Sequence, residues 1–184
     1  MANEPTDAVS PAPTFFQAAG ATIAEDAESL AALHDRELST DLVTALHEAD
    51  FPNCLGLLPA TPAATAAWRV MDTARAELPY RLDSHRLDAL AAEYAAIYLT
   101  GAYGASPCES VWTDDDRLVC QAAMFQLRAL YAATGLATPD WRQRPDDHLV
   151  LQLLYIAHVA RNATTADHWR TLADMLDEHL LRWI

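Results

Sequence analysis

The chain has 184 residues, enough for one domain that buries roughly 70% of its unfolded surface and too few to argue for two. Its hydrophobic content of 52%, with only 5 Gly, favours helices over strands. The formal net charge is −14 and the chain contains no Lys, so its surface repels phosphate backbones. This argues against nucleic acid and for a cationic peptide as partner. A high-salt host or codon bias would produce the same acidity, so charge alone names no partner.

The cysteines and the apolar runs bear on the compartment. Cys54, Cys108 and Cys120 form no C-x-x-C pair and leave an odd thiol, which argues for a reducing compartment. Residues 1–13 are acidic and contain prolines; they predict a disordered tail and lack the features of a secretory signal. The most apolar run, Leu149–Ala160, is well short of the roughly 20 residues that span a bilayer. The sequence therefore predicts a cytoplasmic protein without membrane insertion.

Helical patterning begins at Thr14, with a break predicted at Ser39. The next start signal is Thr61 followed by Pro62. The hydroxyl can accept an orphan amide hydrogen at the N-cap, and Pro at the first helical position gives up a donor that the helix would not use. This helix is expected to run to about Leu78.

The clearest helix has apolar side chains at i, i+3, i+4, i+7, i+10 and i+11, namely Leu87, Leu90, Ala91, Tyr94, Ile97 and Tyr98. A loop follows from Thr100 to Trp112. Thr113 is then predicted to cap a helix whose first turn is Asp114–Asp116, because carboxylates complement the positive end of a helix. That helix is expected to continue to about Thr134, with Gly135 as a left-handed stop.

Two further helices complete the pattern. Residues Leu149–Ala160 are apolar nearly all the way round, which is typical of a central helix covered by others. Thr164 or Thr165 can cap a last amphipathic segment that ends near Trp183. No internal repeat or low-complexity tract interrupts the series. The sequence therefore predicts an all-α, single-domain helical bundle over residues 14–184.

No catalytic or cofactor motif accompanies these helices. The seven His residues do not fall at metal-ligand spacing with a Glu, and the cysteines are far apart. Ser110 lacks the G-x-S-x-G elbow of a nucleophile, and Cys108 has no His at a recognisable family spacing. Gly101 and Gly104 do not belong to a phosphate-binding loop. We therefore expect no metal site and no cofactor, and a chemistry of recognition.

The segment Asp146–His148 has two readings. Asp147 and His148 could form an acid–base pair, although neighbouring residues on a helix point about 100° apart. Alternatively, Asp146 caps the following helix while His148 hydrogen-bonds a nearby backbone group.

The aromatic residues before and after Gly101 also have two readings. Tyr94 and Tyr98 fit core packing as well as a binding surface. Tyr103 and Trp112 stand in a loop, where core packing explains them less well, and they indicate the wall of a groove.

Four segments of the chain resemble, in order and spacing, those of the TorD/DmsD/NarJ family of redox-enzyme maturation chaperones. They are an aromatic-x-x-aliphatic-aromatic run before a glycine, here with one extra residue, a Pro-x-x-Ser-Val-aromatic run, an acidic-Asp-His helix start and a late His-Leu-x-x-Trp segment. The matching residues are Tyr94, Ile97, Tyr98 and Gly101; Pro107, Ser110, Val111 and Trp112; Asp146, Asp147 and His148; and His179–Trp183. The resemblance covers about residues 30–184.

The resemblance implies an all-helical protein that binds the twin-arginine signal peptide and the catalytic subunit of a molybdopterin-containing oxidoreductase. Such a chaperone prevents export of the precursor until the cofactor is inserted. The peptide-binding positions that it implies are Tyr94, Ile97, Tyr98, Gly101, Tyr103, Pro107, Ser110, Trp112, Gln121, Asp147 and His148.

The chain departs from the family pattern at three points. Gln152 stands where relatives often have Glu, and Arg182 stands where the late segment usually has Pro. Members of the family continue for about another helix beyond Trp183, so residues 14–184 are expected to lack a terminal helix. An apolar patch would then be exposed and favour association, which leaves both a monomer and a homodimer open.

The preferred interpretation is a chaperone without catalytic turnover. Carboxylates would accept hydrogen bonds from the arginines of a leader, while aromatic side chains bury its apolar face. The candidate carboxylates are Glu109, Asp114, Asp115, Asp116, Asp146 and Asp147. The alternatives are a small all-α enzyme that uses Asp147 and His148 as acid–base residues, and a helical assembly module without a ligand. The chaperone interpretation requires the segments around Tyr98 and His148 to meet in space.

Overall fold

The computed structural model describes residues 14–184, which form helices and loops without a β-strand. The all-α prediction is therefore confirmed, whereas the predicted tail, residues 1–13, lies outside the described part. The helices are α1 (Phe15–Asp35), α2 (Thr40–Glu48), α3 (Pro62–Glu77), α4 (Ser84–Tyr94), the π-helical turn η1 (Ala95–Leu99), α5 (Ser110–Thr113), α6 (Ala122–Ala133), α7 (Leu149–Arg161), α8 (Ala166–Glu178) and the 3-10 turn η2 (Leu180–Arg182).

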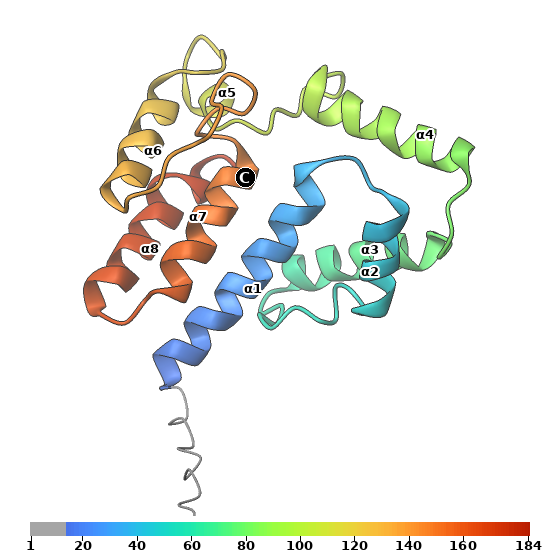
Figure 1. Cartoon of the computed structure of the whole chain (residues 1–184), viewed down its shortest axis with the longest axis horizontal. Coiled ribbons are helices and arrows are strands. Elements are labelled where there is room, and N and C mark those ends of the chain that lie inside the picture. Colours follow the sequence, from blue (N-terminus) through green and yellow to red (C-terminus); the bar gives the residue numbers. More distant parts are fainter. Residues whose placement is uncertain (1–13) are drawn as a thin grey trace, which may run out of the picture.

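Helices α1 and α7 form the centre of the molecule. Figure 1 shows α1 between two groups, with α6, α7 and α8 on one side and α2, α3 and α4 on the other. The face of α1 toward α7 carries small residues, because the two backbones approach closely: a Cβ added to Gly20 would lie 2.3 Å from the carbonyl oxygen of Ala160. Most of α7 is buried, from Val150 to Ala160, so its predicted central place is confirmed.

Most of the predicted helix boundaries are confirmed by their caps. The side chains of Ser39, Thr61 and Thr165 each accept a hydrogen bond from a backbone amide in the first turn of α2, α3 and α8. Pro62 occupies the first position of α3. Gly135 has a φ of 78° just after α6, a left-handed conformation that glycine adopts without strain.

The predicted helix from Thr113 to Thr134 is wrong in its first part. Helix α5 ends at Thr113, Asp114 is extended, and α6 begins only at Ala122. The side chain of Asp114 accepts the amide hydrogen of Asp116 at 3.1 Å, so a short carboxylate competes with the helical backbone as Asp does in turns. The loop also contains two non-glycine residues with positive φ, at Arg117 and Cys120.

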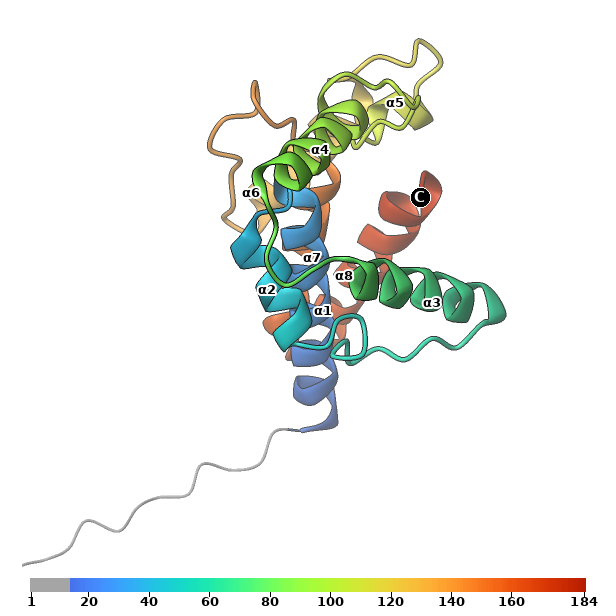
Figure 2. The ribbon, with the colours of Figure 1, turned by 90° about the vertical axis from the view of Figure 1, so that its right-hand side faces the viewer.

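Helices α3 and α4 differ from the others because neither contains a buried residue. Figure 2 shows α4 lying across the end of α1, with α3 extending away from it. The helix of α4 continues into η1, where Thr100 donates to the carbonyl of Ala95 at 2.9 Å, five residues back. Segment α4–η1 therefore joins the rest of the chain mainly at the C-terminal end of α1.

Candidate functional site

The Pro107–Ser110 and Asp147–Leu149 segments lie side by side. The amide of Leu149 donates to the carbonyl of Pro107 at 2.8 Å, and the amide of Glu109 donates to the carbonyl of Asp147 at 3.1 Å. A third hydrogen bond between the two segments runs from the amide of Ser110 to the carboxylate of Asp147, at 2.8 Å. Two of the four family-like segments are therefore clamped together through their backbones.

A buried polar cluster lies beside this clamp and includes the late family-like segment. Nδ1 of His179 donates to the carboxylate of Glu109 at 3.1 Å, and Nε2 of Gln152 donates to the same carboxylate at 3.1 Å. All three side chains are buried. Because Gln152 donates to a buried carboxylate, Glu at this position would place a second negative charge against Glu109.

Asp146 does not cap α7, so that reading of the sequence is wrong. Its buried carboxylate accepts from Nη2 of Arg128 at 2.7 Å and from the hydroxyl of Thr138 at 2.6 Å. The N-cap is His148, whose Nδ1 accepts the amide hydrogen of Val150 at 3.2 Å. The predicted hydrogen bond from His148 to a nearby backbone group is therefore confirmed.

A stacked pair of tyrosines forms the other wall of the site. The rings of Tyr94 and Tyr98 lie 4.5 Å apart with planes 24° from parallel. The hydroxyl of Tyr94 donates to the carbonyl of Asp35 at 3.0 Å, and the hydroxyl of Tyr98 contacts Nδ1 of His34. Both tyrosines are therefore anchored on the last turn of α1, where backbone carbonyls lack helical partners.

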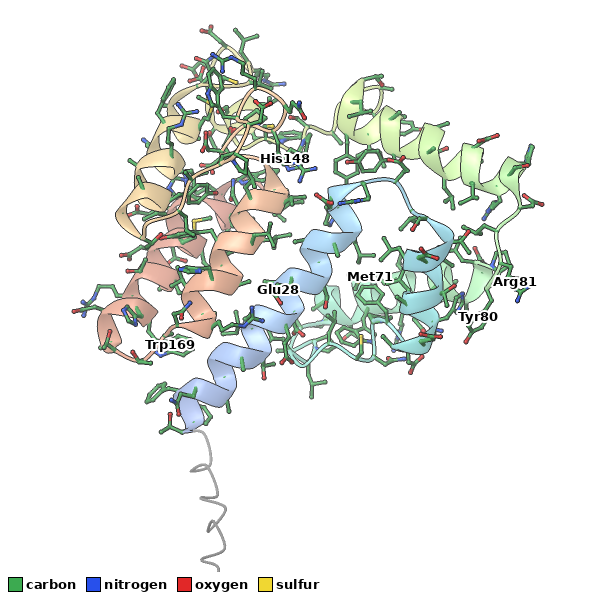
Figure 3. All side chains as sticks on the ribbon, in the orientation of Figure 1. Glu28, Met71, Tyr80, Arg81, His148 and Trp169 are labelled. Atoms are coloured by element: carbon green, nitrogen blue, oxygen red, sulfur yellow. The ribbon has the colours of Figure 1, made fainter. Side chains whose placement is uncertain are left out.

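A cavity of about 410 Å³ lies between the two walls, and we call it the motif cavity. It contains six of the eleven positions that the resemblance implied: Tyr94, Ile97, Tyr98, Gly101, Pro107 and His148. Figure 3 shows His148 at the end of α7 that lies nearest to α4. The segments around Tyr98 and His148, more than forty residues apart in sequence, meet here as the chaperone interpretation requires.

The other five positions lie outside the lining of the motif cavity. Ser110 and Asp147 are buried in the clamp, and Gln121 precedes α6 with its amide donating to the hydroxyl of Ser110 at 3.1 Å. The hydroxyl of the exposed Tyr103 donates to Glu93 at 3.0 Å. Trp112 is also exposed, and its indole nitrogen donates to the carbonyl of Ser106 at 2.9 Å, which holds a segment that does line the cavity.

Sequence reasoning missed the charged group of the motif cavity. Arg144 lines it and donates from Nη2 to the carbonyl of Asp35 at 2.8 Å and from Nη1 to the Asp35 carboxylate. Burial raises the pKa of that carboxyl, but hydrogen bonds from Arg144 and Arg36 outweigh burial and leave the pKa below its ordinary value. The one signal in the sequence was that Arg144 lies two residues before the Asp146–His148 segment.

His148 is neutral in this environment. Burial, together with the charge of Arg144, lowers its pKa to about 4. Since Nδ1 accepts a backbone hydrogen bond, the proton of the neutral ring is on Nε2. Such a ring is a weak base near neutral pH, and Asp147 is hydrogen-bonded to Ser110 instead. This geometry disfavours an acid–base pair. Burial likewise raises the pKa of the Cys108 thiol to about 12, which argues against a nucleophile.

Two further features bear on the class of protein. Within residues 14–184, no group of three or more His, Cys, Asp or Glu side chains is placed to hold a metal ion. Over the same residues, we find no helix with the length and apolarity needed to cross a bilayer.

Comparison with known proteins decides the family. A family model described as nitrate reductase delta subunit matches residues 60–184. The chain belongs to this family. Curated relatives named chaperone protein TorD, from the classical Ogawa and El Tor Inaba strains of Vibrio cholerae, are each 29% identical over 163 residues, which is 84% of this chain and 73% of the relative. No solved structure gives a significant match.

The resemblance to the TorD/DmsD/NarJ family is thus confirmed. Because the relatives are named as chaperones, the chain is a redox-enzyme maturation chaperone and not an enzyme. The family matches name no residues, so the roles of the motif cavity and of the clamp rest on geometry.

Proposed function

We propose that this chaperone binds the twin-arginine signal peptide of a molybdopterin-containing oxidoreductase in the motif cavity. It acts in the cytoplasm and retains the precursor until the cofactor has been inserted into the catalytic subunit. The observation that carries the proposal is that family-like segments far apart in sequence line one cavity of about 410 Å³, a volume within the usual range for ligand sites.

The lining of the motif cavity suits an apolar helical peptide. Tyr94, Ile97, Tyr98 and Pro107 supply aromatic and aliphatic surface, and Leu99 and Val119 extend it with exposed side chains. Apolar side chains of a leader that enter this surface leave water, which favours binding by roughly 25 cal/mol per Å² before the entropy of association is subtracted. Half-buried tyrosines also offer rigid contact area.

The structure changes which carboxylates we expect to bind the arginines of the leader. Glu109, Asp146 and Asp147 are buried and hydrogen-bonded inside the protein, so freeing one of them for a guanidinium would break hydrogen bonds that hold the fold. Asp115 and Asp116 are exposed instead. We therefore assign the arginines of the leader to exposed carboxylates outside the cavity, and the apolar segment to the cavity itself.

A titration tests the proposal. The probe is a fluorescein-labelled synthetic peptide with two adjacent arginines followed by a helix-forming stretch of Leu and Ala. We expect Ile97→Ala and Tyr98→Ala to weaken its binding about tenfold or more, as for anchors of an interface. Val70→Ala is the matched control, because Val70 is exposed on α3 and does not line the motif cavity.

Unchanged affinity in both cavity variants, with helical circular dichroism equal to that of the wild type, would remove the motif cavity as the binding site. Failure of the wild-type protein to bind any twin-arginine peptide would remove the proposed function itself.

A further inference from the structure

Two side chains that line the motif cavity, Arg144 and His148, have N–H groups that can donate hydrogen bonds to an occupant. Arg144 is the one charged side chain among the residues that line it, and no carboxylate does so. A guanidinium has five N–H groups, and Arg144 uses two of them on Asp35. The neutral ring of His148 adds an N–H at Nε2, since its Nδ1 is already an acceptor for Val150. An occupant that supplies acceptors can therefore pair with the N–H groups of Arg144 and His148.

The one charged side chain in the lining of the motif cavity is a cation, Arg144. The carboxylate of Asp35 accepts from Arg144 and from Arg36, whose Nη2 donates at 2.7 Å. Two guanidinium groups thus share one carboxylate. Glu37 and Glu93 are exposed and do not line the cavity. Glu109, Asp146 and Asp147, next to lining residues, are buried and accept hydrogen bonds inside the protein. A cationic side chain inside the cavity would meet Arg144 and would find no carboxylate among the lining residues to pair with.

We propose that Arg144 determines the direction in which a helical leader lies, with the carbonyl end of its apolar segment against Arg144 and its arginine pair outside the motif cavity. This inference rests on the proposed function. The last carbonyls of a helix have no partners within the helix and carry a partial negative charge. They can therefore accept hydrogen bonds from the remaining N–H groups of Arg144 and His148. In the reverse direction, the two arginines of the leader would lie beside Arg144, and the three positive charges would repel one another.

The same arrangement makes the cavity selective for the charge that follows the apolar segment. A leader with Glu after that segment adds a carboxylate that a guanidinium can bind in bidentate geometry, whereas Lys in the same place adds repulsion. Arg144 is therefore a specificity-determining residue whose role differs from that of the tyrosine wall, which supplies apolar surface to either direction.

The first experiment compares two synthetic twin-arginine peptides that differ only in Glu or Lys directly after the apolar stretch. We expect the wild type to prefer the Glu peptide by roughly fivefold or more, Arg144→Gln to lose that preference, and Arg144→Lys to keep it. Arg142→Gln is the matched control, because Arg142 is an exposed arginine of the same loop that stacks on Trp141 and does not line the cavity.

The second experiment leaves Arg144 in place, so it does not depend on the folding of its variants. Gln143, exposed at the cavity, is replaced by Cys in a protein that also carries Cys54→Ser and Cys120→Ser. Peptides with one Cys, either after the apolar stretch or before the arginine pair, are then tested for disulfide trapping under mild oxidation. We expect trapping at the end that follows the apolar stretch.

Preferential trapping beside the arginine pair, equal trapping at both ends, or equal affinity of the wild type for the Glu and Lys peptides would overturn the inference while leaving the proposed function standing. Absence of binding to every twin-arginine peptide would count against the proposed function, and against this inference with it.

Discussion

Replacement of Asp147 tests whether this residue holds the fold together or receives an arginine. Its carboxylate accepts the amide hydrogen of Ser110 at 2.8 Å, and both residues are fully buried. In Asp147→Ala that amide keeps no partner, which costs about 1–3 kcal/mol. Each kcal/mol lowers the Tm of a chain of this length by roughly 2–4 °C, so we expect unfolding about 2–12 °C below the wild type.

Asp147→Asn separates the two roles. The variant keeps an oxygen for Ser110 and places its amide nitrogen at Oδ1, which accepts no hydrogen bond among the described residues. We therefore expect a smaller fall in Tm than for Ala, measured by circular dichroism, and leader affinity within about twofold of the wild type. A wild-type Tm for Asp147→Ala, or an affinity at least tenfold weaker for Asp147→Asn at unchanged Tm, would refute the structural role.

Three further changes test other parts of the structure. Gly20→Val should lower the free energy of unfolding by roughly 1–3 kcal/mol, because its Cβ would lie 2.3 Å from the carbonyl oxygen of Ala160; chemical denaturation measures this, and an unchanged midpoint would contradict the close α1–α7 contact. The pKa of His148 is lowered to about 4 in the folded protein, so between about pH 6.5 and 4 the unfolded chain binds more protons than the folded one. The free energy of unfolding should therefore fall as the pH drops through this range. This fall should be shallower in His148→Asn, and equal pH profiles for the variant and the wild type would disprove the burial of a neutral His148. Arg128→Ala should lower the Tm by several degrees, because Oδ2 of the buried Asp146 loses the two hydrogen bonds that Arg128 donates to it. The exposed Arg86→Ala serves as control, and equal Tm values for the two variants would contradict this role of the ion pair.

The helices were predictable where local chemistry decides their ends. Ser39, Thr61 and Thr165 cap helices as their hydroxyls and positions indicate. The start of α6 was not predictable, because Asp114–Asp116 fits the first turn of a helix as well as it fits a turn. The hydroxyl of Ser110 takes the amide hydrogen of Gln121 from across the loop, a contact that no local pattern reveals.

The residues of the candidate site were likewise predictable only where a local sequence pattern marks them. The aromatic residues of η1 and His148 were found because their segments have a recognisable pattern. Arg144 and Asp35 were missed because they are 109 residues apart and meet only when the end of α1 reaches the loop before α7. Asp147 was grouped with His148 by adjacency, yet consecutive side chains at the start of a helix point in different directions, and Asp147 faces the clamp while His148 faces the cavity.

The claim that the motif cavity is the leader site is tested most directly by amide hydrogen exchange with and without the synthetic twin-arginine peptide. We predict slower exchange in residues 94–101 and 143–148, the two segments that supply most of the cavity lining, and no change in α3, which has no part in it. Protection confined to the cleft between α6 and α8, which is lined by Leu130 and Met175, with unchanged exchange around Tyr98 and His148, would contradict the claim.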